Sequence, residues 1–186
     1  MDPIAPIIGL IDKTEELLGH SPHPAIVTLP IGAWSVSNVC DSLAMLTGDE
    51  RYDDVARVSM AVGLVGAVGA IATGLRDYSH IPPDRPSHAI ATSHALGNAV
   101  VTTLFTASYL LRQRDHLKNQ RTGVLPRLLA LTGGGLSLYT AWLGGVLVEE
   151  HGEGVKPVME HMSDHHDEGR GRERLSPASP LGVHQA

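Results

Sequence analysis

The sequence predicts an all-α fold: an integral membrane four-helix bundle with a short interfacial N-terminal segment and a polar C-terminal tail. Apolar and polar residues are segregated along the 186 residues, so the mean hydropathy of +0.01 conceals long uncharged segments. Residues 58–75, 89–111 and 128–148 carry no charge, and residues 24–46 carry only that of Asp41. Each segment reaches the roughly 18 apolar residues that indicate a membrane-spanning helix.

A water-soluble helical bundle is the alternative to this fold class. The helices of such a bundle normally keep a polar face over about half of their circumference. Residues 58–75 offer only Ser59 and Thr73 for such a face. The pattern therefore favours the membrane.

The first element, residues 1–22, is predicted to be a short helix at the membrane interface. Its start is acidic and its apolar run is too short for a cleavable signal peptide. Its apolar side chains would lie along one side of a helix, as in interfacial helices. They are Ile4, Ile7, Ile8, Ile11 and Leu18.

The membrane domain is expected over residues 23–156. Its spans are predicted near 24–46, 56–75, 89–111 and 125–148. The remaining residues, 157–186, are rich in charged residues, Gly, His and Pro, a composition typical of a disordered, solvated tail. The tail histidines offer a second, weaker place for a transition metal. They are His161, His165, His166 and His184.

The orientation is predicted from the basic residues near the spans, which accumulate on the cytoplasmic side. The first and third loops hold seven, namely Arg51, Arg57, Arg112, Arg114, Lys118, Arg121 and Arg127. The opposite side holds four, namely Lys13, Arg76, Arg85 and Lys156. We therefore expect a multi-pass protein of the plasma (inner) membrane with both termini outside. The net charge of −6 argues against nucleic acid as a partner.

Histidines from different spans converge at the outer side in this topology. His23, His94 and His151 belong to the first, third and fourth spans, and Asp77 ends the second. Imidazoles from several helices with a nearby carboxylate are typical of a haem or metal site. We therefore take these four residues as candidate cofactor ligands, with the three histidines as the metal-binding set.

Three further polar residues lie inside the predicted spans. His94 and Asn98 share one helix face, which must point into the bundle and could equally serve as hydrogen-bonding glue between helices. Asn38 and Asp41 lie in the inner half of the first span. Asp41 is either functional, as ionisable residues in membranes often are, or it reaches the interface and pairs with Arg51 or Arg57.

Four segments resemble, in order, those of the bacterial membrane family called domain of unknown function 2231. They are "HPAIVTLPIGAW", "GLVGAVGAIATGLRD", "HALGN" followed by "YLLR", and "GGVLVEEHGEGV". The resemblance implies a four-helix membrane protein without an assigned activity, related to proteins that carry Rieske iron–sulfur or c-type cytochrome modules. It places the family's histidine and aspartate sites on His23, Asp41, Asp77, His94 and His151.

The expected function is a redox-associated subunit that binds haem b or a transition metal, has no catalysis of its own and serves an electron-transfer partner. Two alternatives stay open. The first is a protein for permeation or sensing of a small ion or molecule that uses Asn38 and Asp41. The second is a purely structural or assembly subunit.

Overall fold

The structure, a computed structural model, describes residues 5–155, within which every regular element is a helix. In chain order these are α1 (Ala5–Leu18), α2 (His23–Ile26), α3 (Thr28–Thr47), α4 (Arg51–Tyr78), α5 (Pro86–Leu117) and α6 (Val124–Glu149). The predicted tail at 157–186, with its four histidines, lies outside the described residues.

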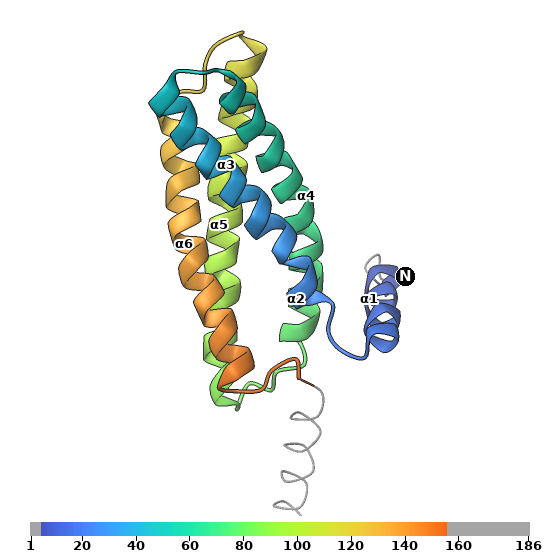
Figure 1. The fold of residues 1–186 in the computed structure, drawn as a ribbon. Coiled ribbons are helices and arrows are strands. Elements are labelled where there is room, and N and C mark those ends of the chain that lie inside the picture. Colours follow the sequence, from blue (N-terminus) through green and yellow to red (C-terminus); the bar gives the residue numbers. More distant parts are fainter. Residues whose placement is uncertain (1–4, 156–186) are drawn as a thin grey trace, which may run out of the picture.

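The four long helices form a bundle of two hairpins (Figure 1). α3 packs along α4, and α5 packs along α6. Contacts of α4 with α5 and of α3 with α6 join the two hairpins. One end of the bundle carries the α3–α4 and α5–α6 loops, and the other carries α2, the α4–α5 loop and the end of α6 (Figure 1). We call them the inner and outer ends, after the predicted orientation.

Helices α4, α5 and α6 contain the predicted spans 56–75, 89–111 and 125–148 and extend beyond them, whereas the predicted span 24–46 is divided at Val27 between α2 and α3. The α3–α4 turn is sharp because Gly48 adopts a left-handed conformation, with φ 73°, and caps α3. α5 begins with Pro86, whose missing N–H is no loss in a first helical turn. It ends at Leu117, six residues after the end of the predicted span. As a result, Arg112, which we expected in a loop, lies within a helix.

The distribution of polar and apolar side chains is the inverse of that in a water-soluble protein. Large apolar side chains of the bundle helices face outward, with exposed fractions of 59% for Val39, 74% for Val65 and 74% for Leu138. The side chains of Asp41 and Arg112, in contrast, are fully buried. Exposed apolar and buried ionised groups are typical of a protein surrounded by lipid.

Two of the described helices, α4 and α6, are long and apolar enough to cross a membrane by themselves. Helices α3, with 20 residues, and α5, with 32 residues, carry the buried ionised pair Asp41 and Arg112. An α-helix of 20 residues, the length of α3, spans about 30 Å, which is the thickness of a bilayer's hydrocarbon core.

Helix α1 confirms the helical prediction for the N-terminal segment. It lies beside the outer end of α4 (Figure 1), where Asp12 and Glu15 pair with Arg76 at 3.0 and 2.7 Å. Ile11 is buried, whereas Ile7 and Leu18 are about half exposed. The location of this helix at the membrane interface stays a prediction.

The outer end of α6 carries an aromatic pair that allows a test of its membrane depth. Trp142 and Tyr139 are 61% and 53% exposed, with ring centroids 5.9 Å apart. Aromatic side chains of this kind gather at the headgroup level of a bilayer. In a Trp34→Phe variant, which leaves Trp142 as the sole tryptophan, lipids brominated near the headgroup should quench fluorescence more strongly than lipids brominated at the chain ends.

The matched control is Trp142→Phe, which leaves Trp34. This ring is 6% exposed and stacks on Phe105 at 4.2 Å, so brominated lipid should quench it weakly. Equal quenching of both variants, or none in either, would contradict the arrangement of the bundle in the membrane.

Candidate functional site

A buried ion pair joins α3 to α5 near the inner end of the bundle. The Arg112 guanidinium donates to both carboxylate oxygens of Asp41, with Nη1 at 2.7 Å from Oδ1. Its remaining donor, Nε, bonds the hydroxyl of Ser108 at 3.1 Å, and Ser108 in turn donates to the backbone carbonyl of Pro126 at the start of α6. The charges are paired bidentately, which is the geometry that best offsets the cost of burying them.

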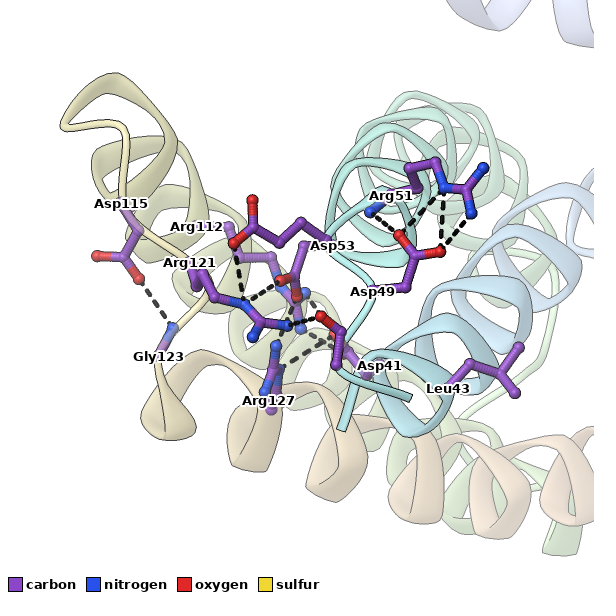
Figure 2. Close-up of polar contacts among 12 residues, drawn as sticks. Asp41, Leu43, Asp49, Arg51, Asp53, Arg112, Asp115, Arg121, Gly123 and Arg127 are labelled. Atoms are coloured by element: carbon purple, nitrogen blue, oxygen red, sulfur yellow. Dashed lines mark hydrogen bonds and ion pairs between the residues drawn. The ribbon is translucent and has the colours of Figure 1, made fainter. Parts of the chain in front are cut away.

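The ion pair is the most deeply buried part of a series of alternating positive and negative side chains, which we call the ladder (Figure 2). Arg127 of α6 lies 3.8 Å from Asp41 and donates to Asp53 of α4 at 2.6 Å. Arg121 then lies 3.7 Å from Asp53 and 3.6 Å from Glu50. The side chains range from fully buried at Asp41 to 74% exposed at Glu50. The ladder therefore ties all four helices together and leads from the bundle interior to the surface.

This ladder corrects our expectation for Asp41. Asp41 does not reach the interface, because its side chain is fully buried, and it does not pair with Arg51 or Arg57. Arg51 instead pairs with Asp49 at 2.6 Å, and Arg57 lies 3.4 Å from Asp54. Both of these ion pairs lie among neighbours in sequence, whereas Asp41 pairs with a residue 71 positions away.

Asn38 lies one turn from Asp41 and faces α6. A Cβ atom on Gly134 would lie only 2.3 Å from Asn38 Nδ2, so only glycine permits this approach. The side-chain oxygen of Asn38 is buried and has no hydrogen-bond partner in the described structure. Asn38 and Asp41 thus both face the other helices of the bundle.

At the outer end, His23 is fixed on α4. Its Nδ1 lies 3.0 Å from Thr73 Oγ1. The Thr73 hydroxyl itself donates to the carbonyl of Gly69 at 2.9 Å, so its oxygen accepts from the histidine. This assigns the proton of a neutral His23 to Nδ1 and makes Nε2 the basic nitrogen. The ring rests on Gly74, where a Cβ would come within 2.8 Å of it.

His94 is fixed on α6 in the same way. Its Nδ1 donates to the carbonyl of Thr140 at 2.8 Å, and its ring rests on Gly144, where a Cβ would lie 3.1 Å away. The amide nitrogen of Asn98 lies 3.1 Å from His94 Nε2, and the amide oxygen of Asn98 accepts from the Thr140 hydroxyl at 3.1 Å. His94 and Asn98 thus form hydrogen bonds between α5 and α6, as the glue interpretation predicts.

Asp77 and His94 both act electrostatically on His23. Asp77 accepts a hydrogen bond from Ser21 at 2.6 Å, and the Ser21 hydroxyl also accepts from the backbone N–H of His23. The pKa of His23, which precedes the first predicted span, is lowered chiefly by burial. The carboxylate of Asp77 raises this pKa, and His94 lowers it further. Three of the four predicted ligands therefore belong to one outer-end cluster.

His151 follows α6 and is half-buried in the turn beyond it. Within residues 5–155, no three His, Cys, Asp or Glu side chains gather closely enough to hold a metal ion. The structure therefore does not assemble the predicted metal-binding set of His23, His94 and His151. Of the predicted ligands, Asp77 and His94 act electrostatically on His23, and joint binding of one group by the histidines stays a prediction.

The sequence analysis missed the residues that orient these side chains. Thr73 and Thr140 hold the two imidazoles, and Gly74 and Gly144 make room for them. A histidine paired with a glycine on the facing helix leaves no local signal, because the partners are about 50 residues apart.

Comparison with known proteins supports the membrane assignment. A family model described as a predicted membrane protein (DUF2231) matches residues 19–157 of the chain, which include the ion-pair ladder and the outer-end cluster. No curated protein and no solved structure matches it.

Proposed function

Since the chain belongs to the DUF2231 family of predicted membrane proteins, we propose that it is a four-span, redox-associated subunit that binds haem b between its helix hairpins. In this proposal His23 and His94 are the axial ligands, and an electron-transfer protein is the partner. A transition metal held by the same two histidines is the variant of this function. The subunit itself catalyses no reaction.

The observation that supports the proposal is the orientation of the two imidazoles. One belongs to the α3–α4 hairpin and the other to the α5–α6 hairpin, and each is oriented by a hydrogen bond from Nδ1 to a protein oxygen. Ligand histidines are typically held this way, because a bond at one nitrogen fixes the tautomer and leaves Nε2 for the metal. This orientation supports the proposal, because it would leave Nε2 of each histidine for the iron of a haem or for another metal.

Binding changes the role of one further residue. Asn98 occupies Nε2 of His94 with its amide nitrogen, and that hydrogen bond must break before His94 can act as a ligand. The amide keeps its other bond, to the carbonyl of His94 at 3.0 Å. Asp77 supplies a negative charge near His23, which favours a cationic group at this place. Bound haem would supply a one-electron redox centre near the outer surface.

A visible absorption spectrum of the full chain, purified in detergent from cells supplied with haem precursor, tests this function. We expect a Soret band that shifts on reduction, or, for the metal variant, a stoichiometric transition metal by elemental analysis. Colourless and metal-free protein that is nevertheless folded would contradict the proposal.

That outcome would favour the structural alternative, which also has a specific observation behind it. Both ring nitrogens of His94 already have protein partners, Thr140 and Asn98. A histidine satisfied in this way stabilises helix packing without any ligand. The protein would then be an assembly subunit of the membrane.

The proposed topology places the inner end, with its ladder of charges, in the cytoplasm. We expect a cysteine at Lys118, in the exposed α5–α6 loop, to resist impermeant thiol reagents in intact cells, whereas one at Asp84, in the exposed α4–α5 loop, should react. The basic residues near the α5–α6 loop are the physical reason. The native Cys40 is buried and is replaced by Ser in both variants. The reverse labelling pattern would contradict the orientation.

A further inference from the structure

A stripe of polar side chains runs along the interior face of α3. Trp34, Ser37, Asn38 and Asp41 are spaced by three, one and three residues, so they share one side of the helix. Ser37 and Asp41 are fully buried, and Trp34 is 6% exposed. The histidine cluster at the outer end involves none of them.

Two of these residues hold buried polar atoms without a hydrogen-bond partner in the described structure. They are the hydroxyl of Ser37 and the side-chain oxygen of Asn38. The Trp34 N–H is unpartnered too, but it is directed at Gly63, where a Cβ would lie 2.3 Å away. Buried polar groups in proteins are almost always satisfied, and bound water is the usual partner where protein atoms are lacking. Ser37 and Asn38 therefore mark a place for water in the bundle centre.

Toward the inner end of the bundle, Ser37 and Asn38 adjoin the ladder of charges. Asp41 lies one turn from both Ser37 and Asn38 along α3. From Asp41 the ladder passes through Arg127 and Asp53 to the exposed Glu50. Arg112 pairs with Asp41, and Arg127 pairs with Asp53. Because each arginine is paired with a carboxylate, the two arginines together present no net positive charge that would repel a proton.

Toward the outer end, α6 offers further hydroxyls. Asn38 meets α6 at Gly134, and Ser137 and Thr140 follow three and six residues later. The hydroxyl of Thr140 bonds the amide of Asn98. Six helical residues rise about 9 Å, a distance that about three hydrogen-bonded steps of 2.8 Å can bridge.

We propose that waters bound at Ser37 and Asn38 connect the Asn98–Thr140 pair to the Asp41–Arg112 pair, and that this path conducts protons across the bundle. Each hydroxyl or water on the path accepts one proton and releases another. At the inner end the proton leaves through water along the ladder, where the carboxylates offset the positive charge of the arginines. Every group is returned to its initial charge, so no co-reactant is consumed. This activity is independent of any haem.

The test uses the full chain reconstituted in liposomes that contain a pH-sensitive dye. With a potassium gradient and valinomycin imposing a membrane potential, wild-type vesicles should acidify faster than protein-free vesicles. Ser37→Ala should slow the acidification. The change removes a hydroxyl that has no protein partner, so it breaks no hydrogen bond in the structure. Asn38→Leu, which keeps the size of the side chain, should lower the rate to that of protein-free vesicles.

The matched control is Val39→Leu. Val39 neighbours Asn38 in sequence but is 59% exposed on the opposite, lipid-facing side, so its rate should equal that of wild type. A wild-type rate no higher than that of protein-free vesicles would overturn the proposal. So would a Ser37→Ala protein that acidifies vesicles at the wild-type rate, whatever the behaviour of Asn38→Leu.

Discussion

Replacing Arg112 by Met should destabilise the bundle by about 3–5 kcal/mol, the range found when one partner of a buried ion pair is removed. The carboxylate of Asp41 is fully buried and would lose both of its hydrogen bonds. Arg127 cannot replace them as it stands, because its Nε is 3.8 Å from Asp41 and makes no hydrogen bond. Thermal unfolding in detergent, followed by circular dichroism, measures this loss.

The double variant Asp41→Leu/Arg112→Met separates the cost of an unpaired charge from the value of the pair. Because the double variant leaves no unpaired buried charge, it should regain most of the stability that Arg112→Met loses. Arg51→Met provides the control, since the partner Asp49 is near the surface and Arg51 is 88% exposed. An Arg112→Met protein as stable as wild type would mean that the pair does not tie α3 to α5.

His23→Ala and His94→Ala should each remove most of the haem or metal signal, and the double variant should lose little more. A metal centre needs its ligands together, so the loss of one ligand sharply weakens the binding of the whole group. The cofactor content of the purified proteins, measured by absorption and elemental analysis, gives the comparison. We expect this loss of cofactor to be the largest functional effect of any single substitution proposed for the protein.

His116→Ala serves as the matched control. His116 lies at the inner end, 3.6 Å from Asp54, and its replacement should leave the cofactor in place. If the histidines serve only as glue, His23→Ala and His94→Ala should instead cost about 0.6 kcal/mol for each interhelical hydrogen bond and change no spectrum. Additive losses of this size in colourless protein would contradict the binding site.

The sequence was sufficient to predict the helical fold and three of the long helices. Long uncharged segments predicted α4 and α6 well, because a helix that crosses a membrane must be long and apolar. The break between α2 and α3 was not predicted, because the apolar run continues through Val27. That His23, Asp77 and His94 bind one group stays a prediction.

The ion-pair ladder could not be predicted in the same way. Arg112 follows the apolar run of α5 directly, so hydropathy placed it in a loop, whereas the helix continues and buries it. The pairing of Arg112 with Asp41 depends on how the two hairpins pack against each other, and no local sequence pattern predicts this packing. The partners Thr73 and Thr140 were missed for the same reason, since each contact joins helices that are distant in sequence.

The electron paramagnetic resonance spectrum of the oxidised, haem-loaded protein tests most directly whether His23 and His94 hold an iron between the two hairpins. Two imidazole ligands give low-spin ferric haem, so we expect a low-spin signal in wild type, and a high-spin signal from the small fraction of haem that His94→Ala retains. A wild-type spectrum that is already high-spin, or one that His94→Ala leaves unchanged, would contradict ligation by these two histidines.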